Sequence, residues 1–173
     1  PGAWRISLEK RADSRGFFAR VFCEEEFAAH GLVTRYPQCN LSYNDKRGTL
    51  RGMHFQRPPK PEIKVVRCLR GAVYDVLLDL RPDSPTYLKH EAFELTADNR
   101  DALYVPEGIA HGFQALTDDA EMFYQMSEFY VPALNDGVRW NDPAFQIEWP
   151  IEDPILSDKD KAYADYTISP WAP

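Results

Sequence analysis

Short runs of β-branched and aromatic residues, separated by residues that favour turns, fill the middle of this chain. Fourteen prolines and nine glycines in 173 residues interrupt the sequence too often for long helices. The runs predict strands over residues 49–56, 62–70, 72–79, 90–95, 102–105 and 121–130. Many short strands with frequent turn signals are typical of an all-β antiparallel sandwich or small barrel of the jelly-roll type.

Helical signals are confined to two short segments outside these strands. Residues 24–31 read EEEFAAHG, with an acidic start and a glycine at the end, and predict a short helix. Residues 158–164 are polar and fit a short helix or a loop. Since no repeat or linker-like stretch divides the chain, we expect a single domain over residues 1–173 with these short helices at its periphery.

The predicted strand over residues 121–130 carries apolar side chains on both faces. Met122, Tyr124 and Met126 share one face because alternate residues of a strand point the same way, and Phe123 lies on the other face. Neither face is plainly polar, which indicates that both are covered. We expect one face to line the interior of the barrel and the other to contact a second copy of the chain in a homodimer.

The charge balance and the cysteines limit the partners and the compartment. A formal net charge of −7 argues against non-specific binding to nucleic acid or to an anionic membrane. No apolar run approaches the roughly 20 residues that span a bilayer, so we expect no membrane partner. The three cysteines are odd in number, widely spaced and without a CxxC pair, which favours a reducing, cytoplasmic setting over a disulfide framework.

Two segments place a histidine beside glycines in this β-rich context. Residues 48–64 read GTLRGMHFQRPPKPEIK and contain His54; residues 104–113 read YVPEGIAHGF and contain His111. The second segment resembles a motif of the cupin superfamily, whose fold is a double-stranded β-helix. The first cupin motif has His-x-His, but here Gln56 replaces the second histidine, and an amide is a poor ligand for a transition metal. We therefore expect no metal and no cofactor, with His54 available as a proton-transfer base.

Seven segments occur in order along nearly the whole chain. They are SRGFF at 14–18, QCNLS at 38–42, GTLRGMHFQ at 48–56, KVVRCLRGAVYDVLLDLRPDSPTY at 64–87, LYVPEGIAHGF at 103–113, RWNDP at 139–143 and LSDKD at 156–160. Together they resemble the dTDP-4-dehydrorhamnose 3,5-epimerase family of metal-free cupins. The resemblance implies a jelly-roll isomerase, usually a homodimer, that inverts C3 and C5 of dTDP-4-dehydro-6-deoxy-D-glucose. The product would be dTDP-4-dehydro-L-rhamnose, on the route to dTDP-rhamnose.

The same resemblance implies a catalytic base and its carboxylate partner. His54 matches the base that removes protons from the carbons beside the C4 ketone. Asp160 matches the partner, and the nearby Asp158 is the alternative. A carboxylate bonded to the far ring nitrogen would fix the tautomer and stabilise the imidazolium.

Two further catalytic groups follow from the resemblance. Lys64 matches a lysine beside the C4 oxygen, where an ammonium group stabilises the developing enolate. Tyr124 matches a tyrosine that returns a proton on the opposite face of the sugar, and Tyr130 is the alternative. Inversion needs this two-sided arrangement, because one group removes a proton and another delivers one.

Five other residues match positions that bind substrate in the family. Arg15 and Arg51 match cations near the nucleotide diphosphate and sugar, where a guanidinium donates paired hydrogen bonds to phosphate oxygens. Gln38 and Asn40 match polar residues of the pocket. His111 matches a second histidine near the keto sugar.

Arg20 departs from the family pattern, because many members have a glutamate at this position. The nucleoside preference is therefore open. Two alternatives stand within the same chemistry: an epimerase that inverts only C3 or only C5, and one that uses another nucleotide-activated 4-keto sugar. From a different class, the chain could be a non-catalytic cupin that binds a sugar nucleotide, or a metal cupin.

Overall fold

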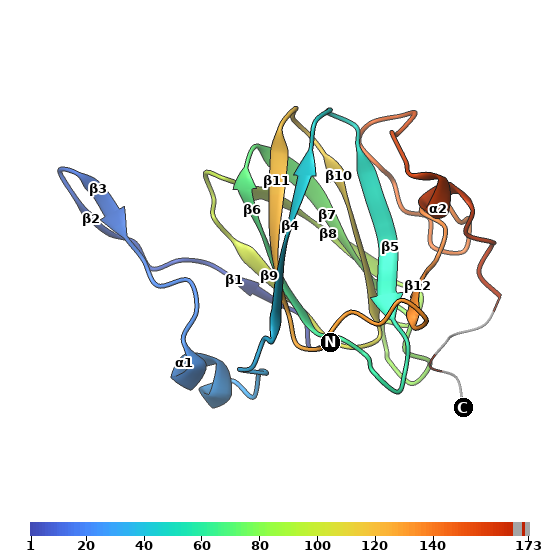
Figure 1. Cartoon of the computed structure of the whole chain (residues 1–173), viewed down its shortest axis with the longest axis horizontal. Coiled ribbons are helices and arrows are strands. Elements are labelled where there is room, and N and C mark those ends of the chain that lie inside the picture. Colours follow the sequence, from blue (N-terminus) through green and yellow to red (C-terminus); the bar gives the residue numbers. More distant parts are fainter. Residues whose placement is uncertain (168–170, 172–173) are drawn as a thin grey trace.

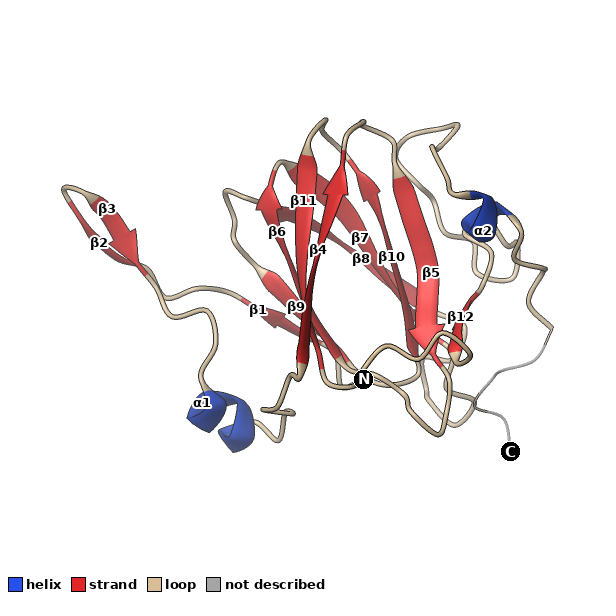
Figure 2. Ribbon diagram, viewed as in Figure 1, coloured by secondary structure: helices blue, strands red, loops and turns tan. Residues whose placement is uncertain are grey.

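The computed structural model describes residues 1–167 and 171, which form two five-stranded antiparallel sheets packed face to face (Figures 1 and 2). The first sheet has the order β1 (Trp4–Ile6), β9 (Ala102–Val105), β6 (Lys64–Arg70), β11 (Ala120–Met126) and β4 (Gln38–Asn44). The second has the order β12 (Asn135–Gly137), β5 (Leu50–Gln56), β10 (Ile109–Ala115), β7 (Ala72–Asp79) and β8 (His90–Thr96). The predicted all-β, cupin-type jelly-roll is therefore confirmed.

Two short helices and a hairpin lie outside this sandwich in the described part of the chain. Helix α1 (Glu24–Ala29) confirms the predicted N-terminal helix, and helix α2 (Asp158–Lys161) lies beside β5. The hairpin of β2 (Arg11–Asp13) and β3 (Gly16–Phe18) extends away from the sandwich on the side opposite to α2 (Figure 1). Over the same described residues, no helix is both long and apolar enough to cross a membrane.

Two strands that border the interior were not predicted from the sequence. Every residue of β10 is buried, so the strand shows no alternation of polar and apolar side chains. In β4 the polar side chains point inward, since Asn40 and Ser42 lie opposite the inward-facing Tyr124 and Met122 of β11. With polar side chains inward and apolar ones outward, β4 lacks the buried apolar face by which a strand is predicted from sequence.

The strand predicted over residues 121–130 ends at Met126, so its last four residues were assigned wrongly. Met126 pairs with Gln38, the first residue of β4, and Pro37 before it has no N–H to extend the ladder. The Ser127 hydroxyl then accepts a hydrogen bond from the Ile63 amide at 2.7 Å. The chain turns away here, and Tyr130 is exposed in the following loop.

Apolar packing covers both faces of the second sheet. Val73 and Leu77 of β7 face the interior, where they pack with Leu103 of the first sheet. Val76 and Leu78 face outward and pack against the C-terminal segment, together with residues such as Phe145. The second sheet is thus held from two sides, which makes β5 and β10 a rigid base for functional side chains.

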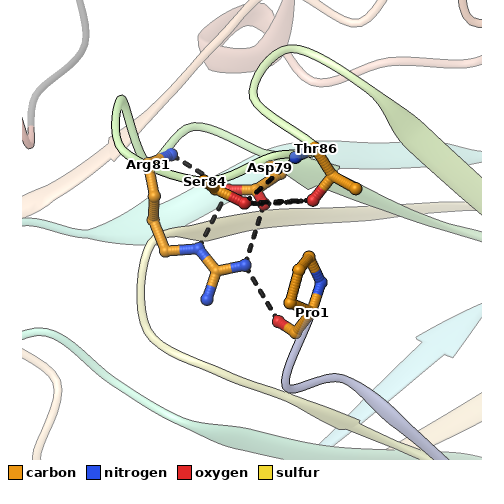
Figure 3. A network of polar contacts seen from close by, with 5 residues as sticks. All are labelled: Pro1, Asp79, Arg81, Ser84 and Thr86. Carbon is orange, nitrogen blue, oxygen red and sulfur yellow. Dashed lines mark hydrogen bonds and ion pairs between the residues drawn. The ribbon is translucent and has the colours of Figure 1, made fainter.

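A buried carboxylate at the end of β7 organises the loop that follows (Figure 3). Asp79 accepts hydrogen bonds from the Ser84 hydroxyl at 2.5 Å and the Thr86 hydroxyl at 2.6 Å. The Arg81 guanidinium donates to both carboxylate oxygens, at 2.9 and 2.8 Å, and to the backbone oxygen of Pro1 at 2.9 Å. Burial acts to raise the pKa of Asp79, but these hydrogen bonds prevail and hold the pKa well below its ordinary value.

The same network fixes the turn that leads into β10. Gly108 has a φ of +78°, and a Cβ there would lie 2.3 Å from Cγ of Arg81. Only glycine therefore lets the Arg81 side chain pack over this turn. The network connects the N-terminus, the β7–β8 loop and the start of the strand that carries His111.

We expect Asp79→Asn to lower the free energy of unfolding by about 3 kcal/mol, because it removes the charge from a buried carboxylate that the half-buried Arg81 guanidinium and two hydroxyls share. The exposed neighbour is the control, and Asp83→Asn should change this free energy by less than about 0.5 kcal/mol. Folding lowers the pKa of Asp79. The stabilisation of the fold by the Asp79 carboxylate is therefore complete above the ordinary carboxyl range near pH 4. This stabilisation is lost as the pH falls below that range. Urea unfolding at pH 7 and pH 3 measures both effects; equal stability of variant and wild type at pH 7 would contradict the role.

Candidate active site

Strands β5 and β10 lie side by side and bring the two motif histidines together. His54 and His111 are paired residues in their antiparallel register. The strands approach closely at two glycines: a Cβ on Gly52 would lie 2.6 Å from Cα of Gly112, and one on Gly112 would lie 2.6 Å from Sδ of Met53. The glycines that flank each histidine in the sequence thus serve the close contact of the two strands.

His54 is bonded to Asp160 across 106 residues of sequence. Its Nε2 lies 2.6 Å from Oδ1 of Asp160, which is 3% exposed. The Ser157 hydroxyl caps α2 by accepting a hydrogen bond from the Asp160 amide at 3.1 Å, which sets the helix so that Asp160 points inward and Asp158 points to solvent. Burial acts to raise the pKa of Asp160, but hydrogen bonding and charge interaction with His54 prevail and lower it. Of the two candidate carboxylates, Asp160 is therefore the one that contacts His54.

Lys64 is buried beside His54 and forms an ion pair that was not foreseen. Its Nζ lies 3.0 Å from Oε1 of Glu62 and donates to the backbone oxygen of His54 at 3.2 Å. Both side chains of the ion pair are less than one-tenth exposed. The ammonium group therefore sits inside the protein with its charge balanced by a neighbour two residues away.

A second histidine–carboxylate pair lies deeper in the sandwich. His111 Nε2 is 2.9 Å from Oδ2 of Asp75, a fully buried residue of β7. The other oxygen of Asp75 has no hydrogen-bond partner within residues 1–167 and 171. Sequence reasoning missed Asp75, although a signal existed: it alternates with Val73 and Leu77 on the interior face of an apolar strand.

Tyr124 lies on the facing sheet and meets this second pair. Its ring packs edge to face on the His111 ring, with centroids 6.1 Å apart. Burial raises the pKa of Tyr124, the negative charge of Asp75 raises it further, and the nearby Arg51 acts in the opposite direction. The phenol is therefore held in its protonated form, which makes Tyr124 a proton donor rather than a base. Tyr130, the sequence alternative, is exposed in the loop after β11.

The expected binding residues Gln38, Asn40 and Arg51 lie along β4, with Gln38 at its start and Arg51 against Asn44 and Tyr43 at its end. The Gln38 amide donates to the side-chain oxygen of Asn40 at 3.1 Å, and Asn40 lies opposite Tyr124 in the β4–β11 register. Arg51 reaches from β5 to β4, where it donates to the side chain of Asn44 at 2.8 Å. A guanidinium thus closes the edge between the two sheets beside the polar face of β4.

Arg15 is not brought to this site within one chain. It lies on the turn of the β2–β3 hairpin, and the hydrogen bonds and ion pairs that the described structure shows for its side chain go to Asp13. The hairpin and β5, which carries His54, lie on opposite sides of the molecule (Figure 1). A single copy therefore leaves Arg15 in solvent.

Gln56, which stands where the first cupin motif has its second histidine, has a structural role. Gln56 donates to the backbone oxygen of Lys60 at 2.6 Å and accepts from the amide of Val131 at 2.8 Å. It thereby holds the two loops that border the site. Among the residues described, no group of three or more His, Cys, Asp or Glu side chains is placed to hold a metal ion.

Two imidazole–carboxylate pairs, an ammonium group and a neutral phenol meet inside one sandwich. The fold and these side chains together define a cupin-type enzyme that works by acid–base chemistry. Comparison with known proteins then identifies the family. A family model described as dTDP-4-dehydrorhamnose 3,5-epimerase matches residues 1–167. The chain belongs to this family of isomerases, as its motifs predicted.

Individual relatives agree with this assignment. A dTDP-4-dehydrorhamnose 3,5-epimerase of Methanothermobacter thermautotrophicus is 42% identical over 172 residues, 98% of this chain and 92% of the relative. A dTDP-4-dehydrorhamnose 3-epimerase of Streptomyces niveus is 45% identical over 161 residues, 92% of this chain and 77% of the relative. The crystal structure of the 3,5-epimerase of Bacillus anthracis, with TDP and PPi bound, has a TM-score of 0.93 at 39% identity and covers 95% of this chain and 94% of its own.

The buried Lys64–Glu62 pair gives a prediction that separates stability from activity. Lys64→Met should lower the free energy of unfolding by about 3 kcal/mol, because it leaves the Glu62 carboxylate buried without its partner. Adding Glu62→Gln should restore most of that stability but not the epimerase activity. Lys60→Met is the control, since its pair with Glu128 is exposed and should contribute less than about 1 kcal/mol. Recovery of activity in the double variant would show that the ammonium group serves stability alone.

Proposed function

We propose that this protein inverts C3 and C5 of dTDP-4-dehydro-6-deoxy-D-glucose to give dTDP-4-dehydro-L-rhamnose, a step in the biosynthesis of dTDP-rhamnose. One observation carries the proposal: the His54–Asp160 pair lies beside a buried ammonium group, and a neutral phenol comes from the opposite sheet. These are the groups that proton removal next to a ketone, followed by proton return on the other face, requires. A binding protein without chemistry would have no use for this set.

His54 is the base in this mechanism. Since Nε2–H donates to Asp160, Nδ1 carries the lone pair that accepts a proton from C3 or C5. The carbon–hydrogen bond breaks, its electron pair enters the C3–C4 or C4–C5 bond, and negative charge moves to the C4 oxygen. Asp160 stabilises the resulting imidazolium and holds the ring in place.

Lys64 and Tyr124 complete the inversion. The Lys64 ammonium group stabilises the enolate oxygen without losing its proton, and Glu62 holds it in position. The Tyr124 hydroxyl then gives its proton to the carbon from the face opposite His54, and the C4 carbonyl re-forms. The His54 imidazolium then releases its proton to solvent, and the Tyr124 phenolate takes one up from solvent. Both groups are thereby restored to their starting protonation states.

The remaining polar groups hold the substrate. His111, oriented by Asp75, would hydrogen-bond the keto sugar through Nδ1, since its Nε2 is engaged. Arg51, Gln38 and Asn40 would bind the sugar and its diphosphate along β4. The TDP and PPi bound by the Bacillus anthracis relative support a thymidine nucleotide as the nucleotide part of the substrate.

The second candidate is an epimerase that inverts only one centre. The Streptomyces niveus relative, at 45% identity, is named as a 3-epimerase, so the family supports both outcomes on closely similar sequences. Arg20, which replaces the usual glutamate, is paired here with Glu26 at 2.7 Å. Its charge is thus partly neutralised on the surface, which favours the thymidine substrate over a change of nucleoside.

The test is proton NMR of dTDP-4-dehydro-6-deoxy-D-glucose with the protein in deuterated buffer. We expect loss of both the C3 and the C5 proton signals; loss of one alone would identify the single-centre enzyme, and loss of neither would refute the proposed reaction. His54→Ala should slow exchange about 10³-fold or more. Asp160→Asn should slow it about 10²-fold or more, while the exposed Asp158→Asn should leave it unchanged.

We also propose that the protein is a homodimer, built on the outer face of the first sheet. Leu41 and Leu69 are 60% and 48% exposed on this face, and Phe18 of the projecting hairpin is 73% exposed. A groove of about 490 Å³ between hairpin and sheet is lined by apolar residues such as Phe17 and Phe123. An isolated hairpin is marginally stable in water, so a second copy that covers it is favoured. In such a dimer the hairpin would bring Arg15 to the partner's site.

Sedimentation velocity tests the dimer. Wild type should sediment as a dimer, and Phe18→Asp should shift the population towards monomer, because it places a carboxylate in the apolar interface. The control is Ile155→Asp, which is also exposed, at 51%, but lies beside α2 on the other side of the sandwich and should stay dimeric. A monomeric wild type would remove the proposed route for Arg15 into the site.

We infer a cytoplasmic location from the cysteines. Cys23, Cys39 and Cys68 are all free thiols. Free thiols persist in a reducing compartment, which supports the location.

A further inference from the structure

Tyr163 lies beside the His54–Asp160 pair although no motif singled it out. It follows helix α2 by two residues, and Ala162 between them keeps a helical conformation with φ of −86° and ψ of −6°. Residues three apart in such a turn lie on one side, so Asp160 and Tyr163 both face β5. The Tyr163 ring meets the His54 ring at an angle of 63°, with centroids 6.2 Å apart.

A glycine on β12 makes the space for this ring. Gly137 is the register partner of His54 in the β12–β5 pair. A Cβ at Gly137 would lie 2.5 Å from Cζ of Tyr163 and 2.5 Å from the backbone oxygen of Met53. Tyr163 therefore packs directly on the strand that borders His54 and cannot move closer to it.

The hydroxyl of Tyr163 does not explain why it is there. Its oxygen is buried and has no hydrogen-bond partner in the part of the chain that the structure describes. Burial raises the pKa of Tyr163, and the negative charges of Asp160 and Asp136 raise it further, so the group is neutral. A buried hydroxyl without a hydrogen-bond partner destabilises the fold. The role of this side chain must therefore come from the contacts of its ring.

We infer that Tyr163 is a positioning residue for the base His54. Its ring blocks rotation of the imidazole away from Asp160 and keeps water from the carboxylate side of the pair. The His54 side chain is 31% exposed and that of Asp160 only 5%, so the pair opens towards substrate on one side and is closed on the other. Tyr163 forms part of the closed side. This inference rests on the proposed role of His54.

The experiment compares Tyr163→Leu with Tyr163→Phe. Phenylalanine retains the ring and should keep kcat and KM within about twofold of wild type. Leucine removes the planar contact and should lower kcat about 10- to 100-fold with little change in KM, because a misoriented base slows proton transfer without weakening substrate binding. The control is Tyr166→Leu in the same C-terminal segment, where Tyr166 packs on Phe145 away from the pair; it should lower the melting temperature but not kcat.

Three results would overturn the inference. They are a wild-type kcat in Tyr163→Leu, an equal loss in Tyr163→Phe, and an equal loss in Tyr166→Leu. A readout without substrate keeps the test independent of the proposed reaction: the His54 Nε2 proton should give a slowly exchanging NMR signal in wild type and Tyr163→Phe, and lose it in Tyr163→Leu. If wild type fails to exchange the sugar protons, the proposed function fails, and this signal alone decides the positioning role.

Discussion

The burial of ionisable groups between two apolar sheets is the constraint on which this site depends. A charge taken from water into such an interior is strongly destabilised unless an opposite charge or several hydrogen bonds meet it. Here each group meets one close partner: Lys64 meets Glu62, His111 meets Asp75, and His54 meets Asp160. In each pair one residue can face a substrate while the other holds it. The same contacts therefore support both stability and chemistry.

These pairs also make the site a product of the whole fold. Asp160 reaches His54 only because the C-terminal segment packs on the outer face of the second sheet, where Phe145 and Val138 join its apolar core. Asp75 reaches His111 only through the β7–β10 pairing. A change that detaches the C-terminal segment from the sheet, rather than only weakening its packing as Tyr166→Leu does, would therefore release the carboxylate from the base before the sandwich itself unfolds, since the core between the sheets does not include that segment.

The sequence predicted the strands that obey ordinary patterning and missed those that build the site. The strands over 72–79 and 102–105 were placed to the residue because their apolar runs end at clear turn signals. Strands β4 and β10 escaped notice because polar or uniformly buried residues replace the usual alternation. Motif matching found His54, but only the phase of helix α2, set by its cap, separates Asp160 from Asp158.

The sandwich itself supplies the two-sided geometry that inversion requires. His54 stands on the second sheet and Tyr124 on the first, so a sugar held between the sheets would meet the base on one side and the acid on the other. In a D-gluco-configured ring the hydrogens on C3 and C5 project from the same face, so one base and one acid can serve both carbons in turn. Asp160 holds the His54 ring on one side of the sugar, and burial, which raises the pKa of Tyr124, keeps a proton on the phenol on the other side. In the proposed reaction, the choice between one centre and two then falls to the groups that hold the substrate, because they decide whether the ring can shift until C5 replaces C3 between His54 and Tyr124.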